Sequence, residues 1–227
     1  MSEKARVVEF QVKYIYILSA VVPFITVGLC WACYYGLKHN RDRIYPVLTI
    51  SETVELLPES RIFNIGMTIE ALLQGIVFIL RQHYLHTKIR RESSPVRKCL
   101  KYATTFCSFF CPFMLIGLAN FVVSEFFMIH MSTTIIYFVF AIVYFFLYDI
   151  LLYMIGPKPK LYSSLVVFLA FIACICSVAF RNTIIVSKVS YVTISSISQY
   201  IAVFMLCLKT SLTIVDIPTH GIRFFSK

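Results

Sequence analysis

The sequence predicts an all-helical integral membrane protein with six transmembrane helices, and three observations lead to this prediction. Of the 227 residues, 59% are hydrophobic and 14% are charged, whereas about a quarter of the residues in soluble domains are charged. The mean hydropathy is +0.81. Six apolar runs are close to the length of about 20 residues that a helix needs to cross a hydrocarbon core of about 30 Å.

The composition excludes several other classes of protein. There are too few charged and turn residues to cover a soluble core of this size with a polar surface. The 21 Phe and 14 Tyr supply far more apolar area than a disordered chain carries. Nearly all of the eight Cys lie in apolar stretches, which argues against a secreted disulfide scaffold. Runs such as 135–148 lack the alternation of apolar and polar residues that is typical of a transmembrane β-barrel.

The first predicted span covers residues 14–36. It follows a basic start that is typical of a signal peptide, formed by Lys4, Arg6 and Lys13. Its 23 residues exceed the apolar segment of a cleavable signal, and no small-residue cleavage site closes it. We therefore expect this segment to remain as a transmembrane helix.

The other spans follow in order along the chain. The second, third and fourth are predicted over residues 62–82, 102–124 and 134–155. The fifth and sixth, over 161–180 and 191–208, are weaker because the link between them is partly apolar and the last run contains several polar residues. These are Ser195, Ser196, Ser198 and Gln199. A protein with five spans is the alternative.

The distribution of Lys and Arg predicts the orientation, because these residues are enriched in cytosolic loops. Both terminal segments and the second and fourth connections together hold 15 of them, and the opposite side holds six. Both termini are therefore expected to be cytosolic. The formal charge of +10 divides into about +11 on the cytosolic side, about +1 on the other side and about −2 within the membrane. The predicted organisation is a single six-span domain over 1–227, with a non-cytosolic loop at 37–61 and a basic cytosolic loop at 83–101.

The loop at 37–61 is the only connection dense in both charges and turn residues, and long loops in compact proteins are often functional. Ser60 is expected to cap the second span, because a Ser oxygen can accept the free amide hydrogens of a helix start. Glu59 favours the positive end of the helix dipole. The alternative is that the loop is solvated and contributes only a helix cap.

This loop resembles the signature of the DRAM/FRAG/Sfk family of six-span membrane proteins, which reads approximately I-S-D-T-G-x-x-P-P-E-S-x-I-F. The matching residues are Ile50, Ser51, Glu52, Thr53, Pro58, Glu59, Ser60, Ile62 and Phe63. Their spacing agrees without a gap. The chain departs from the signature at Glu52, Val54 and Leu57, where the family usually has Asp, Gly and Pro. Gly117, Phe121, His130 and the stretch around Gln199 and Tyr200 also look like family positions, although the family often has Glu-Trp in place of Gln199-Tyr200.

The resemblance implies one of three functions. The damage-regulated autophagy modulators promote autophagy from lysosomal membranes, the Sfk-like branch supports phosphatidylinositol 4-kinase complexes at the plasma membrane, and the FRAG-like branch takes part in remodelling GPI-anchor lipids. The intact P-E-S-x-I-F element is most similar to the first branch. We therefore expect a non-enzymatic regulator of autophagy in lysosomal or endosomal membranes, with the plasma membrane and the Golgi as alternative locations.

Two acidic residues within predicted spans, Glu70 and Asp149, indicate a polar site inside the membrane. Burying a carboxylate in the bilayer is costly, so each should face the interior of the helical bundle and find a partner. No Lys or Arg is expected near them in the spans, so the expected partners are polar neighbours. These are Gln74, Asn120, Ser198 and Gln199. The site would hold a lipid headgroup or a proton; the alternative is that these groups only make interhelical hydrogen bonds.

His130 is the histidine of most interest, because it is expected in a short non-cytosolic loop and can change its charge near lysosomal pH. With Glu125 and the acidic residues of the loop at 37–61 it would form an external polar site. Those acidic residues are Glu52, Glu55 and Glu59. The alternative is a solvated loop histidine.

The basic cytosolic loop is expected to attract anionic phospholipid, since each basic residue adds about 1 kcal/mol near such a surface. It is also the expected contact for a peripheral protein partner. The residues concerned are Lys88, Arg90, Arg91, Arg97 and Lys98, and the neighbouring Cys99 is a candidate for palmitoylation. No motif for nucleic-acid binding, a metal, a cofactor or catalysis accompanies them.

Overall fold

The computed structural model describes residues 7–39, 47–89, 94–156, 158–182, 188–216 and 221–225. Among them are six helices long and apolar enough to cross a membrane, which confirms the predicted fold class. They are α1 (Lys13–Gly36), α3 (Glu59–Lys88), α4 (Pro95–Asn120), α5 (Phe127–Ile155), α6 (Leu161–Asn182) and α7 (Lys188–Asp216). The expected limits of single helices were less accurate, since most of the helices extend past their apolar runs into polar residues.

Local chemistry explains several of these helix limits. Pro95 occupies the first turn of α4, where its missing amide hydrogen costs nothing, and the Ser94 hydroxyl accepts the Arg97 amide at 3.5 Å. Gly156, with a φ of 129°, ends α5 in a conformation that favours glycine. The predicted cap at Ser60 is wrong. Helix α3 begins one residue earlier, after Pro58 and without a side-chain cap, and the Ser60 amide donates to the Leu56 carbonyl at 2.8 Å.

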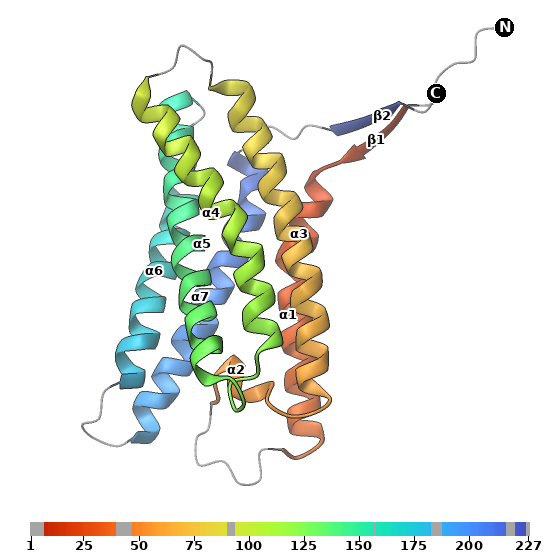
Figure 1. Ribbon diagram of the computed structural model, residues 1–227, viewed down its shortest axis with the longest axis vertical. Helices are drawn as coiled ribbons and strands as arrows, with labels where there is room; N and C mark the ends of the chain where they lie inside the picture. Colours follow the sequence, from red (N-terminus) through yellow and green to blue (C-terminus); the bar gives the residue numbers. More distant parts are fainter. Residues whose placement is uncertain are drawn as a thin grey trace, which may run out of the picture.

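The six long helices form a closed ring in the order α1, α3, α4, α5, α6 and α7, with α7 returning to α1 (Figure 1). Two glycines allow close approach within this ring. A side chain at Gly66 in α3 would overlap the Thr26 side chain of α1. A Cβ at Gly117 in α4 would lie 2.9 Å from the Thr133 Cγ2 in α5. Small residues at such contacts are typical of helix packing in membranes, where close van der Waals contact drives association.

The two ends of the ring carry different small elements. The short helix α2 (Ile50–Thr53) lies across one end, which we call the loop end. At the opposite, terminal end, strand β1 (Val7–Gln11) pairs antiparallel with β2 (Gly221–Phe225), so the two terminal segments meet there (Figure 1). This two-stranded sheet was not expected from the sequence. The segment at 83–101 is mostly helical, since α3 runs to Lys88 and α4 begins at Pro95.

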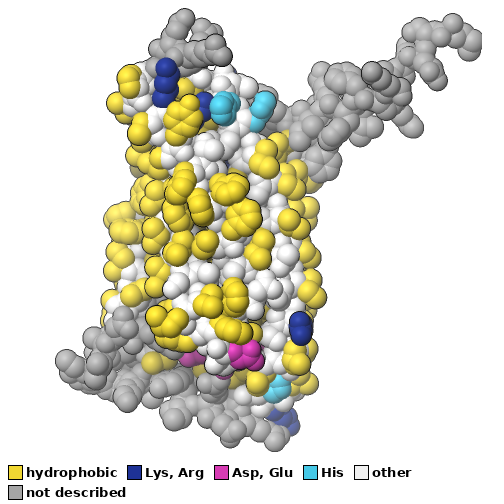
Figure 2. All heavy atoms as spheres, viewed as in Figure 1, with side chains coloured by type: hydrophobic (Ala, Val, Ile, Leu, Met, Phe, Trp, Pro, Cys, Tyr) yellow, Lys and Arg dark blue, Asp and Glu magenta, His cyan; other side chains and the backbone are white. Residues whose placement is uncertain are grey.

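The outer surface of the ring is apolar. All six long helices expose large hydrophobic side chains. Figure 2 shows them covering the middle of the visible face, while Lys, Arg and His side chains gather toward the two ends. This arrangement is the one expected for a helical bundle that meets hydrocarbon along its length and headgroups at its ends.

Candidate functional site

A cavity of about 60 Å³ lies inside the ring of helices, between α1, α3, α4, α5 and α7, and α2 covers it at the loop end. Its walls are mainly apolar. The polar residues that line it are Ser51, Glu70, Gln74, Thr134, Tyr137, Gln199 and Thr210. The cavity therefore brings together Glu70 and Gln199, two of the residues singled out from the sequence.

Glu70 is buried in α3, with 4% of its surface exposed. The Ser19 hydroxyl of α1 donates to its Oε1 at 2.8 Å, while its Oε2 is buried without a hydrogen-bond partner. The prediction that Glu70 faces the interior and is hydrogen-bonded is confirmed. The predicted partners were wrong, because the contact comes from a serine in the first span.

Helix α2 is fixed over the cavity by two polar contacts. The backbone amide of Ile50 donates to Gln199 Oε1 of α7 at 3.0 Å, and the Ser51 hydroxyl lies 2.8 Å from His130 Nε2 of α5. The other ring nitrogen of His130, Nδ1, is 2.7 Å from the Phe121 carbonyl. Since a carbonyl can only accept, Nδ1 carries a hydrogen, and in the neutral ring Nε2 accepts the Ser51 hydroxyl hydrogen.

His130 is not the solvated loop residue that was the alternative expectation. It lies in the first turn of α5 and is 3% exposed. The connection between α4 and α5 is displaced from the predicted place because α4 ends at Asn120 and α5 starts at Phe127. Both ring nitrogens of His130 bond other groups, and Glu52 and Glu59, two of the acidic residues expected beside it, bond Thr49 and His39.

Two of the acidic residues of the loop at 37–61, Glu52 and Glu59, have local structural contacts. Glu59, fully buried at the start of α3, pairs with His39 at 2.8 Å. Glu52 forms a capping box with Thr49, whose backbone amide donates to Glu52 Oε2 at 2.8 Å. Of the other signature residues, Thr53 and Phe63 are buried, and Pro58 is exposed.

Asn120 lies apart from the cavity. Its Oδ1 accepts a hydrogen bond from the Asn64 side chain at 2.7 Å, and its amide nitrogen donates to the Ile116 carbonyl at 2.8 Å. The first of these contacts joins α3 to α4, and the second lies within α4. Asn120 is thus a packing contact at the loop end of the third span and does not contact Glu70.

Asp149 belongs to a separate polar cluster toward the terminal end. Lys209 Nζ of α7 lies 2.7 Å from Asp149 Oδ1 and 2.9 Å from Oδ2, and it also donates to the Ser163 hydroxyl of α6 at 2.7 Å. The Ser164 hydroxyl adds a further bond to Oδ2 at 2.8 Å. The expectation that no basic residue lies near the intramembrane acids is therefore wrong for Asp149. Lys209 was expected in the cytosolic tail, but α7 continues to Asp216.

Arg81 is a second buried basic residue that was not recognised from the sequence, because it was counted in the cytosolic loop. Its side chain is 1% exposed, and its Nε and Nη1 have no hydrogen-bond partner. The guanidinium carbon lies 4.8 Å from the ring centre of Tyr148, 5.0 Å from Phe145 and 5.6 Å from Tyr144. Cation–π contacts with three rings of α5 therefore surround this charge.

These two basic residues change the charge distribution within the bundle. Arg81 and Lys209 balance the two acids expected within the membrane, Glu70 and Asp149, so these four residues have a formal charge of zero instead of the expected −2. The number of Lys and Arg assigned to the cytosolic side falls from 15 to 13, against six on the other side. The side expected to be cytosolic therefore still holds more Lys and Arg after these two residues are subtracted, so the predicted orientation is unchanged.

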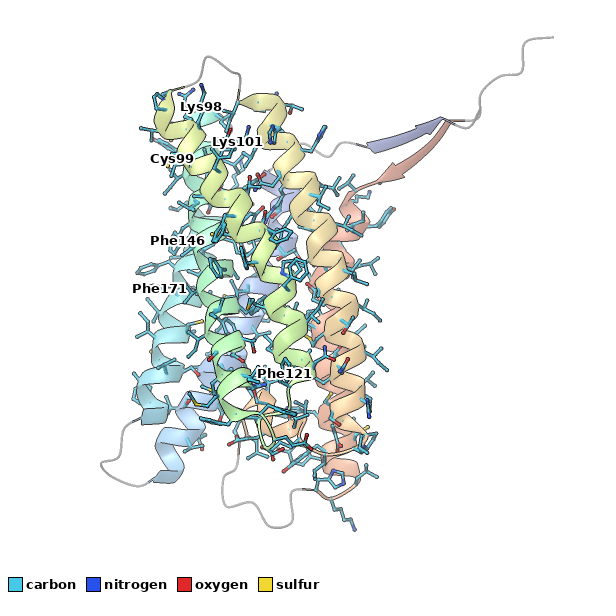
Figure 3. The ribbon with its side chains drawn as sticks, viewed as in Figure 1. Lys98, Cys99, Lys101, Phe121, Phe146 and Phe171 are labelled. Carbon is cyan, nitrogen blue, oxygen red and sulfur yellow. The ribbon has the colours of Figure 1, made fainter. Side chains whose placement is uncertain are left out.

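The described basic residues among those predicted to contact anionic lipid lie at the terminal end. Lys88 at the end of α3 and Lys98 near the start of α4 are exposed, and Arg97 is half-buried. Cys99 is exposed beside Lys98 (Figure 3). Arg90 and Arg91 lie outside the described residues.

Among the described residues, the site offers two kinds of chemistry. The cavity offers a buried carboxylate and an amide within apolar walls, an arrangement typical of a ligand pocket with few polar groups. The Ser51–His130 pair has the contacts of a nucleophile and a base, with the imidazole oriented by a backbone carbonyl. The contact from Ser51 to His130 joins residues 79 positions apart, so no local motif could have predicted it.

A family model described as Frag1/DRAM/Sfk1/Cwh43P N-terminal domain matches residues 11–220, which is most of the chain. No curated protein and no solved structure matched the chain. The family match covers all six long helices and the signature loop, and it agrees with the resemblance carried by Ser51, Glu59 and Phe63. The chain therefore belongs to the Frag1/DRAM/Sfk1/Cwh43P N-terminal domain family.

Proposed function

We propose that this protein regulates autophagy from lysosomal or endosomal membranes, with both termini in the cytosol, and that it acts through contacts with lipid or protein partners. The proposal rests on one observation. The P-E-S-x-I-F element typical of the autophagy-modulator branch is intact, and two of its residues are buried: Glu59 against His39, and Phe63 in the core and in the cavity wall. The element is thus an integral part of the loop end.

Deletion and re-expression under starvation test this proposal. Wild-type protein should restore autophagic flux in cells that lack it. Glu59→Ala, which removes the buried partner of His39, should restore less flux at equal membrane abundance. Glu125→Ala is the matched control, because Glu125 is an exposed acid at the same end. Unchanged flux after deletion would reject the autophagy role, and a tagged protein found only at the plasma membrane or Golgi would reject the location.

The terminal end supports a contact with anionic phospholipid of the cytosolic leaflet. Lys88 and Lys98 are exposed there, and a bias of 13 basic residues to six favours the cytosol on that side. The same surface would serve a peripheral kinase partner if the Sfk-like function applied. Replacing Lys88 and Lys98 by Gln should then release that partner from the membrane, and unchanged recruitment would count against this alternative.

The Ser51–His130 pair favours a second candidate function, an activity on lipid esters such as those of GPI anchors. In such a reaction Ser51 Oγ would attack the ester carbonyl while its proton passes to His130 Nε2 and then to the leaving alcohol; attack by water or a second alcohol would release the acyl group. A fluorophosphonate probe tests this function. It should label wild type and Ser60→Ala but neither Ser51→Ala nor His130→Gln, and a wild-type protein that takes no label would reject the candidate.

A further inference from the structure

Glu70 differs from the other buried charged residues inside the ring of helices. Asp149 has Lys209, and Arg81 has three aromatic rings. Glu70 has one neutral donor, Ser19, and none of the described residues that line the cavity is Lys, Arg or His. Arg81 lies eleven residues further along α3, about 16 Å away at 1.5 Å per residue. The carboxyl group therefore has no positive partner among the described residues.

A second unpartnered acceptor lies beside Glu70. Gln74 is one helical turn further along α3, so both side chains share one face of the helix. The Gln74 Nε2 donates to the Tyr137 hydroxyl at 3.2 Å, whereas its Oε1 is buried without a partner, like Glu70 Oε2. Buried polar groups are normally hydrogen-bonded. The two unpartnered atoms are both oxygen acceptors, and both residues line the cavity.

The rest of the cavity restricts the ligand further. Its walls come mainly from apolar side chains such as Met67, Leu115 and Phe138. Its volume of about 60 Å³ is several times the volume of about 10–15 Å³ that one water molecule needs on this measure, enough for a small headgroup but not for a whole lipid. A phosphate is excluded by charge, because the acid would repel it and no described basic residue of the lining would bind it.

We propose that this cavity binds the headgroup of a single-chain lipid amine, with a protonated amine between Glu70 Oε2 and Gln74 Oε1. A primary ammonium carries three hydrogen-bond donors and no acceptor, which matches two unpartnered acceptors and an uncompensated acid. The first carbons of the chain contact the apolar wall, and the remainder extends between helices to the bilayer. This inference does not rest on a role in autophagy.

Photocrosslinking tests the proposal on the full chain in membranes. The probe is a photoactivatable, clickable sphingoid base. Its N-acetylated form is the matched control ligand, because acetylation removes the charge but keeps the hydroxyls and the chain. A phosphatidylcholine probe reports general contact with lipid. We expect saturable labelling by the amine, with crosslinked peptides from the cavity-lining parts of α3 or α5. Labelling by the N-acetylated form should be lower by at least about tenfold, which corresponds to about 1.4 kcal/mol.

Two variants complete the test. Glu70→Gln keeps the shape of the side chain and should lower labelling by at least about tenfold. Glu125→Gln, an exposed acid at the loop end, should label like wild type. If Glu70→Gln fails to accumulate, the competition of unlabelled amine with the amine probe for the wild-type protein tests the proposal without this variant. Equal labelling by the N-acetylated form, full labelling of Glu70→Gln, or crosslinks only on the outer surface would each overturn the proposal.

Discussion

Asp149 in α5 and Lys209 in α7 form a buried ion pair that joins two helices across the ring, with Nζ–O distances of 2.7 and 2.9 Å. The Lys209 side chain is 1% exposed and the Asp149 side chain 9%. Ser163 and Ser164 of α6 complete the hydrogen bonding of the pair. Three helices therefore meet at one charged contact, next to the aromatic and aliphatic cluster that also encloses Arg81.

We expect Lys209→Met to lower the free energy of unfolding by about 3–5 kcal/mol, because it leaves a buried carboxylate without its partner. The double variant Asp149→Leu with Lys209→Met should recover much of this loss, since replacing both charges by apolar groups is often neutral. Thermal unfolding in detergent measures both effects. Lys98→Met, an exposed lysine at the terminal end, should change little, and a double variant less stable than either single one would contradict the interpretation.

The sequence predicted the fold well because hydropathy measures the property that the membrane selects. Each of the six apolar runs corresponds to one long helix, yet the run at 191–208 ends just before Lys209, which lies within α7. A polar stretch after an apolar run looks the same whether it leaves the membrane or continues as a helix whose polar side chains face the interior. Hydropathy therefore could not distinguish an interior lysine from a cytosolic one. Arg81 lay at the end of the run at 62–82 but was counted with the cytosolic loop, because hydropathy does not show whether an arginine at the end of a run faces the interior.

The candidate site was predicted only in part. Glu70 and Gln199 were found because polar residues within apolar spans are costly unless they face the interior. Ser19 was not found, since a serine carries no such signal. The spacing of Thr49 and Glu52 fits a capping box, although none was predicted there. The contacts of Ser51 with His130 depend on how α2 lies across the ring, which is tertiary information.

Gly66 allows α1 and α3 to approach closely, so Gly66→Ala should destabilise the protein. The new Cβ would lie 2.8 Å from Thr26 Cβ and closer still to Thr26 Oγ1. Thr26 has little freedom to move, because its χ1 is restricted and its hydroxyl bonds the Val22 carbonyl. A loss of about 1–3 kcal/mol is expected, as for overpacking. Gly28→Ala is the control, since nothing lies within 4 Å of the methyl group that it would add. Equal melting temperatures for the two variants would disprove the close contact.

Gln199 holds α2 over the cavity, so Gln199→Leu should loosen this helix without unfolding the ring. The variant leaves the Ile50 amide without its acceptor, and an unsatisfied buried donor costs about 1–3 kcal/mol. Hydrogen exchange measured by mass spectrometry should become faster for peptides covering 48–54, while peptides from the middle of α5 keep their protection. Gln82→Leu, in the terminal half of α3, serves as the control. Unchanged exchange at 48–54 would show that α2 does not depend on this contact.

Trp31 is the only tryptophan of the chain, and its fluorescence can report the contact between α1 and α7. Its indole N–H donates to the Tyr200 hydroxyl at 2.8 Å, and the two rings meet edge to face with centroids 5.6 Å apart. Tyr200→Phe keeps the ring contact and removes the acceptor. We expect the emission maximum of Trp31 to shift to shorter wavelength, with a loss of about 0.5–1.5 kcal/mol in stability. Tyr162→Phe, on the exposed side of α6, should leave the spectrum unchanged. An identical spectrum for Tyr200→Phe would mean that the hydrogen bond does not form.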